Sequence, residues 1–348
     1  MQYTTSIDLS DNHLSDDSLV PILAAVKNIA CLLSLNLSRN RFGISTSKAM
    51  ANYLDSTNCH LKALVLQSCD IDDRECARFV RALSSNSSST IEEIDLSNNK
   101  MGSSEARNVI DDRIMTGGEA IAEFLRSKVC RLQSLKLSYN SIRLGSAARL
   151  TDSVAGNSSL TLLDLSYNAL GTDGGLGLGA ALESNCTLRE LVLGHCGLGS
   201  RPCFVIGTTV LDHPSLTKLS IDWNPVGLHG ARALMDIPLC LGDRVAISLV
   251  GCDVASRDHT FLFDPGSPCR SYDLDLENLF DRAIVRSLFV LVKSHPSYSI
   301  SQFSVNGENI QLCVAEVVRQ DFSPAQAAAK VALEAALSAL DNSCELVG

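Results

Sequence analysis

Apolar residues recur with a fixed spacing along most of this chain. In residues 160 to 171, LTLLDLSYNALG, leucines stand at Leu160, Leu163, Leu165 and Leu170, and Asn168 follows three places after Leu165. The same spacing returns in the segments 4–14, 32–43, 61–71, 91–102, 132–142, 188–199, 216–227 and 244–254. Alternation of apolar and polar residues is typical of a strand with one buried face. The pattern therefore predicts a short strand at the same place in each of nine repeats.

If Leu160 is counted as position 1, position 9 of every repeat holds asparagine or cysteine. Its occupants are Asn12, Asn40, Cys69, Asn99, Asn140, Asn168, Cys196, Asn224 and Cys252, separated by 28, 29, 30, 41, 28, 28, 28 and 28 residues. An asparagine there can bond backbone groups that leave the strand, and we expect cysteine to fill the place as a small apolar group. The step of 41 residues predicts a polar insertion near 103–116, which we expect to form a surface loop.

Between the predicted strands, apolar residues recur at the spacing of one helix face. In residues 15–29, Leu19, Ile22, Leu23 and Val26 share one face, and Pro21 predicts that this helix begins near residue 19 or 20. Residues 72–85 and 118–127 have the same character. Residues 200–213 contain Pro, Gly and several β-branched residues, so a short or irregular helix is expected there.

This L-x-x-L-x-L-x-x-N-x-L pattern resembles the leucine-rich repeat. The period of 28 residues with a helix in each repeat resembles the ribonuclease-inhibitor-like subclass, over residues 4 to about 254. The resemblance implies an α/β fold: a curved solenoid with a parallel sheet on its concave face and helices on its convex face. Solenoids of this kind bind other proteins, so the resemblance also implies a protein partner.

The repeat pattern stops near residue 254, and we divide the chain there. Residues 1–254 are the predicted solenoid, and residues 255–348 are a predicted α+β module that caps the solenoid or docks a partner. Within it, 272–295 predicts a short strand and a helix, Asn306-Gly307 predicts a hairpin turn, and 323–340 predicts an Ala-rich helix.

The net charge and the cysteine content indicate which partners and which cellular location to expect. A net charge of −10 and a pI near 5.2 argue against nucleic acid and anionic membranes as partners, and favour proteins with basic residues. The opening MQYTTSIDLSDN lacks the pattern of a signal peptide, and no apolar run reaches membrane-spanning length. With 13 cysteines placed according to the repeat, we expect free thiols and a cytoplasmic location, including a cytoskeletal, ciliary or organellar complex.

Motifs for metal, nucleotide or nucleophilic chemistry are not found in the sequence. Gly175-x-Gly177-x-x-Ala180 superficially matches a dinucleotide fingerprint, but a later repeat has the similar run GLHGARAL at the same place, so the repeat explains it. We therefore expect no catalytic residue, no metal, no cofactor and no small-molecule substrate.

The candidate binding site lies at position 8, just before the asparagine or cysteine of each repeat. Its occupants are Asp11, Arg39, Ser68, Asn98, Tyr139, Tyr167, His195, Trp223 and Gly251. Four consecutive repeats thus bring Tyr, Tyr, His and Trp to one register, which predicts an aromatic ridge beside the concave face. Aromatic residues dominate protein-binding sites, although rings at this register can also simply cover the sheet edge. The charged residues expected beside the ridge, which could select a basic partner, are Lys136, Asp164, Glu190 and Asp222.

These features predict a non-enzymatic scaffold that binds a protein on its concave face or at the solenoid ends. One alternative is a structural subunit of a large assembly, such as an axonemal or mitochondrial complex, suggested by the abrupt first repeat and the appended C-terminal module. Another is a GTPase-activating protein resembling the activators of Ran. In that case the resemblance places Arg39 and Asn40, within SRNRFG, at the contact with the GTPase.

Overall fold

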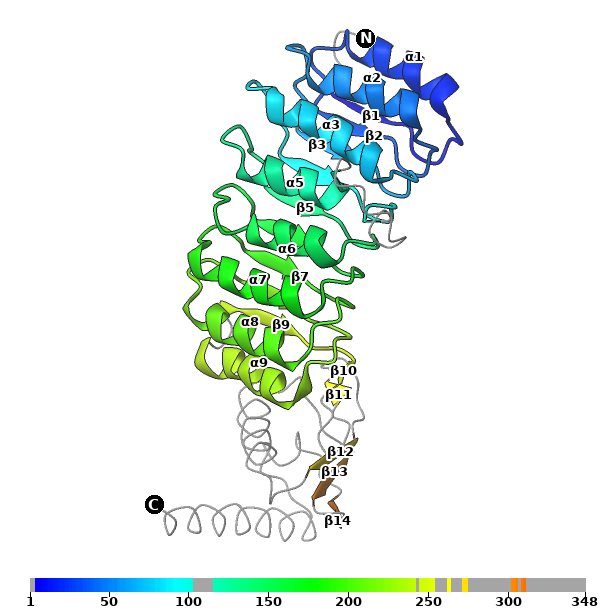
Figure 1. Cartoon of the computed structure of the whole chain (residues 1–348). Helices are drawn as coiled ribbons and strands as arrows, with labels where there is room; N and C mark the ends of the chain where they lie inside the picture. The colour runs from blue at the N-terminus through cyan, green and yellow to red at the C-terminus, as the bar shows by residue number, and fades with distance from the viewer. Residues whose placement is uncertain are drawn as a thin grey trace. The chain divides into compact units, whose positions relative to one another are not determined.

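The computed structural model describes residues 4–102, 115–241 and 244–253, together with the strand segments 262–263, 271–274, 302–305 and 308–310 (Figure 1). The chain divides into two compact units. The first contains residues 1–198 and 212–220, and the second contains residues 199–211 and 221–348.

Eight strands of the first unit form a parallel sheet in chain order. They are β1 (Ser6–Asp8), β2 (Ser34–Asn36), β3 (Ala63–Val65), β4 (Glu93–Asp95), β5 (Ser134–Lys136), β6 (Leu162–Asp164), β7 (Glu190–Val192) and β8 (Lys218–Ser220). Equivalent residues of neighbouring repeats pair in register, as Leu135 does with Leu163. The middle residue of each strand points inward, and from Leu35 onward its exposed fraction is 3% or less.

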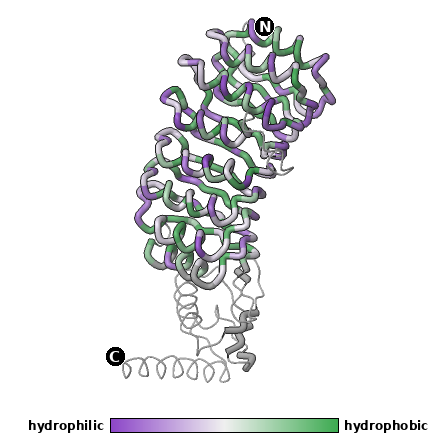
Figure 2. Tube along the Cα trace, in the orientation of Figure 1, coloured by the Kyte–Doolittle hydropathy of each residue, from purple (hydrophilic) through white to green (hydrophobic). Residues whose placement is uncertain are grey.

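Six helices alternate with these strands and stack beside one another on one side of the sheet (Figure 1). They are α1 (Asp16–Val26), α2 (Ile44–Leu54), α3 (Asp73–Ser85), α5 (Gly117–Arg126), α6 (Leu144–Asp152) and α7 (Gly171–Ser184). Hydrophobic and hydrophilic residues are interleaved within each described repeat (Figure 2), as the sequence pattern requires. The architecture is that of a leucine-rich-repeat solenoid, so the predicted fold class is confirmed.

Helix α1 begins earlier than Pro21 led us to expect. It starts at Asp16 and holds Pro21 in its sixth position. Proline removes one backbone donor and leaves a carbonyl without its helical partner. Pro21 and Asp17 are both exposed, so the unpaired carbonyl of Asp17 faces water and the cost is small.

Position 9 holds the repeats together, as predicted for asparagine. The Asn168 amide donates to the carbonyls of Leu137 and Leu165 at 2.8 and 3.0 Å, and its Oδ1 accepts from the backbone N–H of Ile142 at 3.1 Å. Cysteine does more than fill space there: the Sγ of Cys196 donates to the carbonyl of Leu165 at 3.2 Å. Each of these side chains therefore bridges its own repeat to the one before.

The buried carboxylate of Asp73 binds the backbone on both sides of the predicted insertion. Asp73, the first residue of α3 and only 1% exposed, accepts at Oδ1 from the backbone N–H of Gly102 at 2.7 Å and of Gly117 at 2.8 Å. These two glycines flank the predicted insertion near 103–116, which lies largely outside the described residues. Helix α5 starts directly afterwards with a capping box formed by Thr116 and Glu119.

The second unit continues the alternation with α8 (Ser200–Asp212), α9 (Gly227–Leu241) and β9 (Ala246–Ser248). Helix α8 is a regular helix of 13 residues, so the predicted short or irregular helix was wrong. A Cβ at Gly207 would lie 2.7 Å from the carbonyl carbon of Ala233. The glycine that weakens the isolated helix is therefore what lets α8 approach α9, and tertiary packing overrides propensity.

Five further strands lie beyond β9. They are β10 (Cys252–Asp253), β11 (Leu262–Phe263), β12 (Ser271–Leu274), β13 (Gln302–Val305) and β14 (Glu308–Ile310). Strands β13 and β14 pair antiparallel on either side of Asn306-Gly307, which confirms the predicted hairpin. The helices predicted in 272–295 and 323–340 lie outside the described residues, and the division at residue 254 stays a prediction.

None of the helices in the described part of the chain is both long enough and apolar enough to span a lipid bilayer.

Candidate functional site

Every residue at position 8 has a left-handed backbone. The φ angles are 58° for Asp11, 57° for Arg39, 57° for Ser68, 54° for Asn98, 53° for Tyr139, 55° for Tyr167, 53° for His195, 56° for Trp223 and 64° for Gly251. The chain turns sharply here, directly after the strand, and swings the side chain outward while position 9 turns inward. Within each unit, the candidate residues therefore occupy equivalent turns, one in each repeat.

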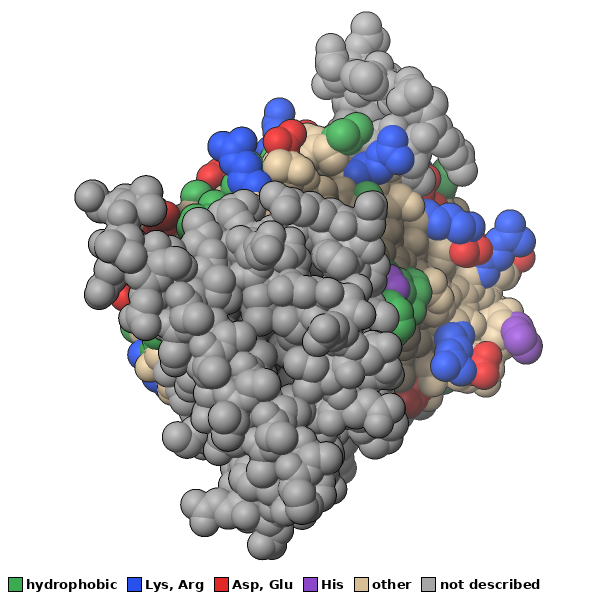
Figure 3. Space-filling model, turned by 90° about the horizontal axis from the view of Figure 1, so that it is seen from below, with side chains coloured by type: hydrophobic (Ala, Val, Ile, Leu, Met, Phe, Trp, Pro, Cys, Tyr) green, Lys and Arg blue, Asp and Glu red, His purple; other side chains and the backbone are tan. Residues whose placement is uncertain are grey.

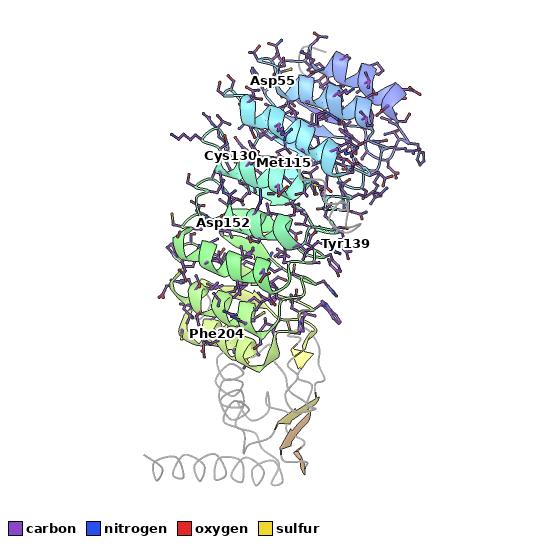
Figure 4. The ribbon with its side chains drawn as sticks, viewed as in Figure 1. Asp55, Met115, Cys130, Tyr139, Asp152 and Phe204 are labelled. Carbon is purple, nitrogen blue, oxygen red and sulfur yellow. The ribbon has the colours of Figure 1, made fainter. Side chains whose placement is uncertain are left out.

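Three of the predicted aromatic residues form a continuous stack. The ring centroids of Tyr139 and Tyr167 are 3.8 Å apart with an interplanar angle of 12°, and those of Tyr167 and His195 are 4.3 Å apart at 22°. All three side chains are exposed, Tyr139 to 51% and Tyr167 to 39%. Figure 4 shows Tyr139 at the margin of the repeats, in the loop between β5 and α6. We call Tyr139, Tyr167 and His195 the ring stack.

The two tyrosine hydroxyls are also linked. A hydrogen bond between Tyr139 and Tyr167 raises the pKa of Tyr139, with a smaller contribution from desolvation. Rings in this arrangement cover one another's faces and leave their outer edges and hydroxyls toward solvent. The stack thus presents a narrow, amphipathic strip, which suits contact with a protein surface.

Bulky residues are unfavourable in this backbone conformation. The left-handed region suits Gly, Asn and Asp, and costs other residues roughly 1–2 kcal/mol. Asp11, Asn98 and Gly251 fit this preference, whereas Tyr139 and Tyr167 oppose it. Ring stacking offsets part of this cost, by about 0.5–1.5 kcal/mol for each pair. Strained residues that remain exposed are more typical of a binding surface than of a structural one.

Trp223, the fourth predicted member of the ridge, belongs to the second unit. Its side chain is 55% exposed, and its backbone N–H donates to the carbonyl of Val250 at 2.7 Å. A Cβ at Gly251 would lie 2.5 Å from Cδ2 of the indole. The indole therefore rests on the backbone of Gly251, the position-8 residue of the next repeat.

The charged residues predicted beside the ridge already have partners within the protein. Lys136 Nζ lies 4.0 Å from Asp95 Oδ2, and Glu190 Oε2 lies 3.3 Å from Lys218 Nζ. Figure 3 likewise shows basic and acidic side chains next to one another on the visible face of the described residues. These pairs reduce the net charge that a partner would meet.

The two predicted aspartates organise the backbone. Asp164 Oδ1 accepts from the backbone N–H and the hydroxyl of Ser166 at 2.9 and 2.6 Å. Asp222 Oδ1 accepts from the Ser248 hydroxyl at 2.6 Å and from the Val250 N–H at 2.8 Å. Asp222 thus joins one repeat to the next, and Asp164 fixes the turn that leads to Tyr167.

The residues of the alternative GTPase contact differ in their accessibility. Arg39 is exposed and lies 3.9 Å from Asp11. Asn40 is 4% exposed, donates to the carbonyls of Leu9 and Leu37, and accepts from the N–H of Leu14. Its amide therefore performs the same internal role as Asn168.

The cysteines at position 9 are poor nucleophiles. Burial raises the pKa of the Cys69 thiol to about 11 and that of the Cys196 and Cys252 thiols to about 12, so all three are protonated near neutral pH. Over the residues that the structure describes, no three His, Cys, Asp or Glu side chains are grouped so as to hold a metal ion.

Comparisons with known proteins agree with this architecture. A family model described as leucine-rich repeat matches residues 5–23, 57–74, 156–179, 184–201 and 212–235. Among curated proteins, NACHT, LRR and PYD domains-containing protein 5 of Mus musculus is 30% identical over 142 residues, covering 41% of this chain and 11% of its own length. NACHT, LRR and PYD domains-containing protein 12 of Mus musculus is 29% identical over 222 residues, and NACHT, LRR and PYD domains-containing protein 3 of Bos taurus is 30% identical over 225 residues. Each of these last two matches covers 64% of this chain and 20% of the relative's own length. The chain therefore spans a fifth or less of the length of all three relatives.

Among solved structures, an internalin from Listeria monocytogenes superposes with a TM-score of 0.42 at 17% sequence identity, covering 72% of this chain and 62% of its own.

Proposed function

We propose that this leucine-rich-repeat protein is a non-enzymatic scaffold that binds a protein partner beside its concave face, over the ring stack. Leucine-rich repeats in general mediate protein–protein interaction. The period of 28 residues and the helix in each repeat further favour the ribonuclease-inhibitor-like subclass. The free thiols of the described cysteines favour a reducing, cytoplasmic setting.

The observation that carries this proposal is the combination of strain and exposure in the ring stack. Tyr139 and Tyr167 occupy backbone positions that disfavour them and remain 51% and 39% exposed. A partner that covers these rings would bury a large amphipathic area at little cost in side-chain entropy, because stacking already fixes the rings. Trp223, which is 55% exposed, lies in the second unit and presents a separate exposed ring.

The test is partner capture by the wild-type chain and by a variant with Tyr139→Asn, Tyr167→Asn and His195→Asn. Asparagine is the natural residue at this register in Asn98, where it adopts the same left-handed backbone. The substitutions should therefore preserve the fold, as checked by circular dichroism, and remove the rings. We expect proteins captured by the wild type from native lysate to be lost with this variant.

A matched control carries Arg39→Asn and Ser68→Asn, which change the same register outside the ring stack. This control should retain the partner. Retention of the partner by the ring-stack variant would contradict the proposal and leave the rings as covering for the sheet edge. The Arg39 substitution also tests the GTPase-activator alternative. Arg39 is the exposed residue of that predicted contact, because Asn40 is buried and its amide bonds the backbone inside the protein.

A structural subunit of a larger assembly is the second candidate, and one observation favours it. Ile7 and Leu9 are partly exposed, whereas their equivalents in the next repeat, Leu35 and Leu37, are fully buried. A neighbouring protein that covered the first repeat would bury them. Strong binding of an apolar dye, lost in a variant with Ile7→Ser, would support this role, and a monodisperse, stable chain that binds no dye would count against it.

A further inference from the structure

Three aspartates occupy position 5, the last residue of their strands, and share one arrangement. Asp8, Asp95 and Asp164 each accept at Oδ1 from the backbone N–H of the serine two residues later, at 2.9 Å in every case. This bond orients the carboxylate on the outward face of the sheet. The second oxygen, Oδ2, takes no part in this bond.

In two of the three repeats, the next strand provides a partner for Oδ2. Asp8 Oδ2 accepts from the Asn36 side chain at 3.0 Å, and Asp95 Oδ2 lies 4.0 Å from Lys136 Nζ. The residue paired with Asp164 on the next strand is Val192, which offers no polar group. Among the described residues, no hydrogen bond or ion pair reaches Asp164 Oδ2.

This carboxylate belongs to the same repeat as Tyr167, the central ring of the stack. Asp164 is partly buried and ends the strand that leads to Tyr167, and Val192 ends the strand that leads to His195. Both faces of the Tyr167 ring are covered, by Tyr139 and by His195. A cation therefore cannot bind to the face of this ring, and Asp164 is the group that would attract one.

Lys136 does not bind Asp164 Oδ2. It pairs in register with Asp164, but its ammonium group is the one that lies 4.0 Å from Asp95 on the opposite side. Asp164 thus keeps a partly desolvated negative charge, held in a fixed orientation by two hydrogen bonds from Ser166. Such a carboxylate forms a stronger bond with a cation than a fully solvated, mobile one does.

We propose that Asp164 determines the specificity of this surface. The partner is a protein segment that places one lysine or arginine side chain against Asp164 Oδ2 while an apolar part of the segment covers the ring stack. This inference rests on the proposed function, because it requires that the ring stack binds a protein. Only one carboxylate oxygen is open, so the site accepts either basic side chain and does not need the two-pronged contact of arginine.

The experiment selects ligands from a display library of random linear peptides with the full-length chain and with Asp164→Asn. Asparagine is a suitable replacement because Asn36, at the same position, accepts from the Ser38 N–H at 3.1 Å. The control is Asp8→Asn, which removes an equivalent carboxylate that is already paired, with Asn36, and leaves the contact between Lys136 and Asp95 in place. Wild type and control should enrich peptides with a lysine or arginine at one fixed place, and Asp164→Asn should not.

The best wild-type peptide is then compared with a version in which its basic residue is glutamine. We expect the glutamine peptide to bind wild type roughly tenfold more weakly and to bind Asp164→Asn as well as the original does. An equal loss on both proteins would overturn the assignment of Asp164. Peptides that bind equally well with and without the ring stack would overturn the proposed function, and a library that yields no peptide would overturn both.

Discussion

The indole of Trp223 lies flat against Gly251, so closely that a Cβ on this glycine would stand 2.5 Å from both Cδ2 and Cε3. Gly251 also has a φ of 64°, which side chains disfavour. Gly251 is therefore favoured for two reasons. Its backbone adopts the left-handed conformation common to position 8, and the Trp223 ring leaves no room for a side chain.

The substitution Gly251→Ala should displace the indole and destabilise the second unit. The new methyl group would overlap the ring and strain the backbone, for a combined cost of about 2 kcal/mol or more. Because Trp223 is the only tryptophan, its fluorescence emission reports on this place alone. The emission maximum should shift in the native state, and the urea midpoint should fall.

Gly197→Ala is the matched control. Gly197 has a φ of 67°, and nothing lies within 4 Å of the place that a Cβ would take there. It should cost about 1 kcal/mol through backbone strain alone and leave the tryptophan emission unchanged. If both variants shifted the emission equally, contact between Gly251 and the indole would not be the cause.

Tyr139→Asn should change the free energy of unfolding by less than about 1 kcal/mol, because relief of left-handed strain offsets the loss of stacking. Tyr139→Ala loses the same stacking but gains less, since alanine also disfavours this backbone. Alanine should therefore be the less stable of the two in urea denaturation. The opposite order would show that strain at position 8 contributes little.

Asn168→Ala should destabilise the first unit by about 3 kcal/mol, because it leaves the buried Leu137 carbonyl and the buried Ile142 N–H without their partner and removes one of the donors to the Leu165 carbonyl. Asn168→Cys should recover part of this loss. Cys196, in the equivalent slot, donates from Sγ to the carbonyl of the preceding repeat. Thermal unfolding of the two variants measures the difference, and a cysteine variant no better than alanine would refute a bridging role for the thiol.

Tyr167→Phe should lower the pKa of Tyr139 toward 10, the ordinary tyrosine value, because it removes the hydroxyl that raises it. In the wild type, the folded-state pKa of Tyr139 lies above the unfolded value. Its contribution to stability is therefore complete below about pH 10 and is lost as the pH rises through the folded-state pKa. Titration of the Tyr139 ring carbon signals by NMR would follow the shift, and identical curves would contradict the hydroxyl contact.

The repeat register predicted the ring stack because each repeat contacts mainly its neighbours along the chain, so equivalent positions lie side by side. Once Tyr139 and Tyr167 share a position in adjacent repeats, parallel strand pairing brings their rings together. The same logic predicted that Asn168 bonds the backbone. Both conclusions depend only on spacing, which the sequence contains directly.

Other features depended on contacts between residues far apart in sequence. The left-handed backbone at position 8 was not predicted, although Gly251, Asn98 and Asp11 in that column are the residue types that favour it. Helix α8 was mispredicted because Pro202, Gly207 and several β-branched residues lower helix propensity, and the contact between Gly207 and Ala233 cannot be seen without the fold. The open oxygen of Asp164 likewise depends on which residue the next strand places opposite.

Asp73 gives the chain a natural site for engineering. Because one oxygen atom receives the N–H groups of both Gly102 and Gly117, the intervening segment leaves and rejoins the repeats at a single anchored point. Loop closure costs only about 0.6 kcal/mol for each doubling of length. A fluorescent domain or affinity tag could therefore replace residues 103–114 without altering the spacing of β4 and α5, and report on binding from outside the ring stack.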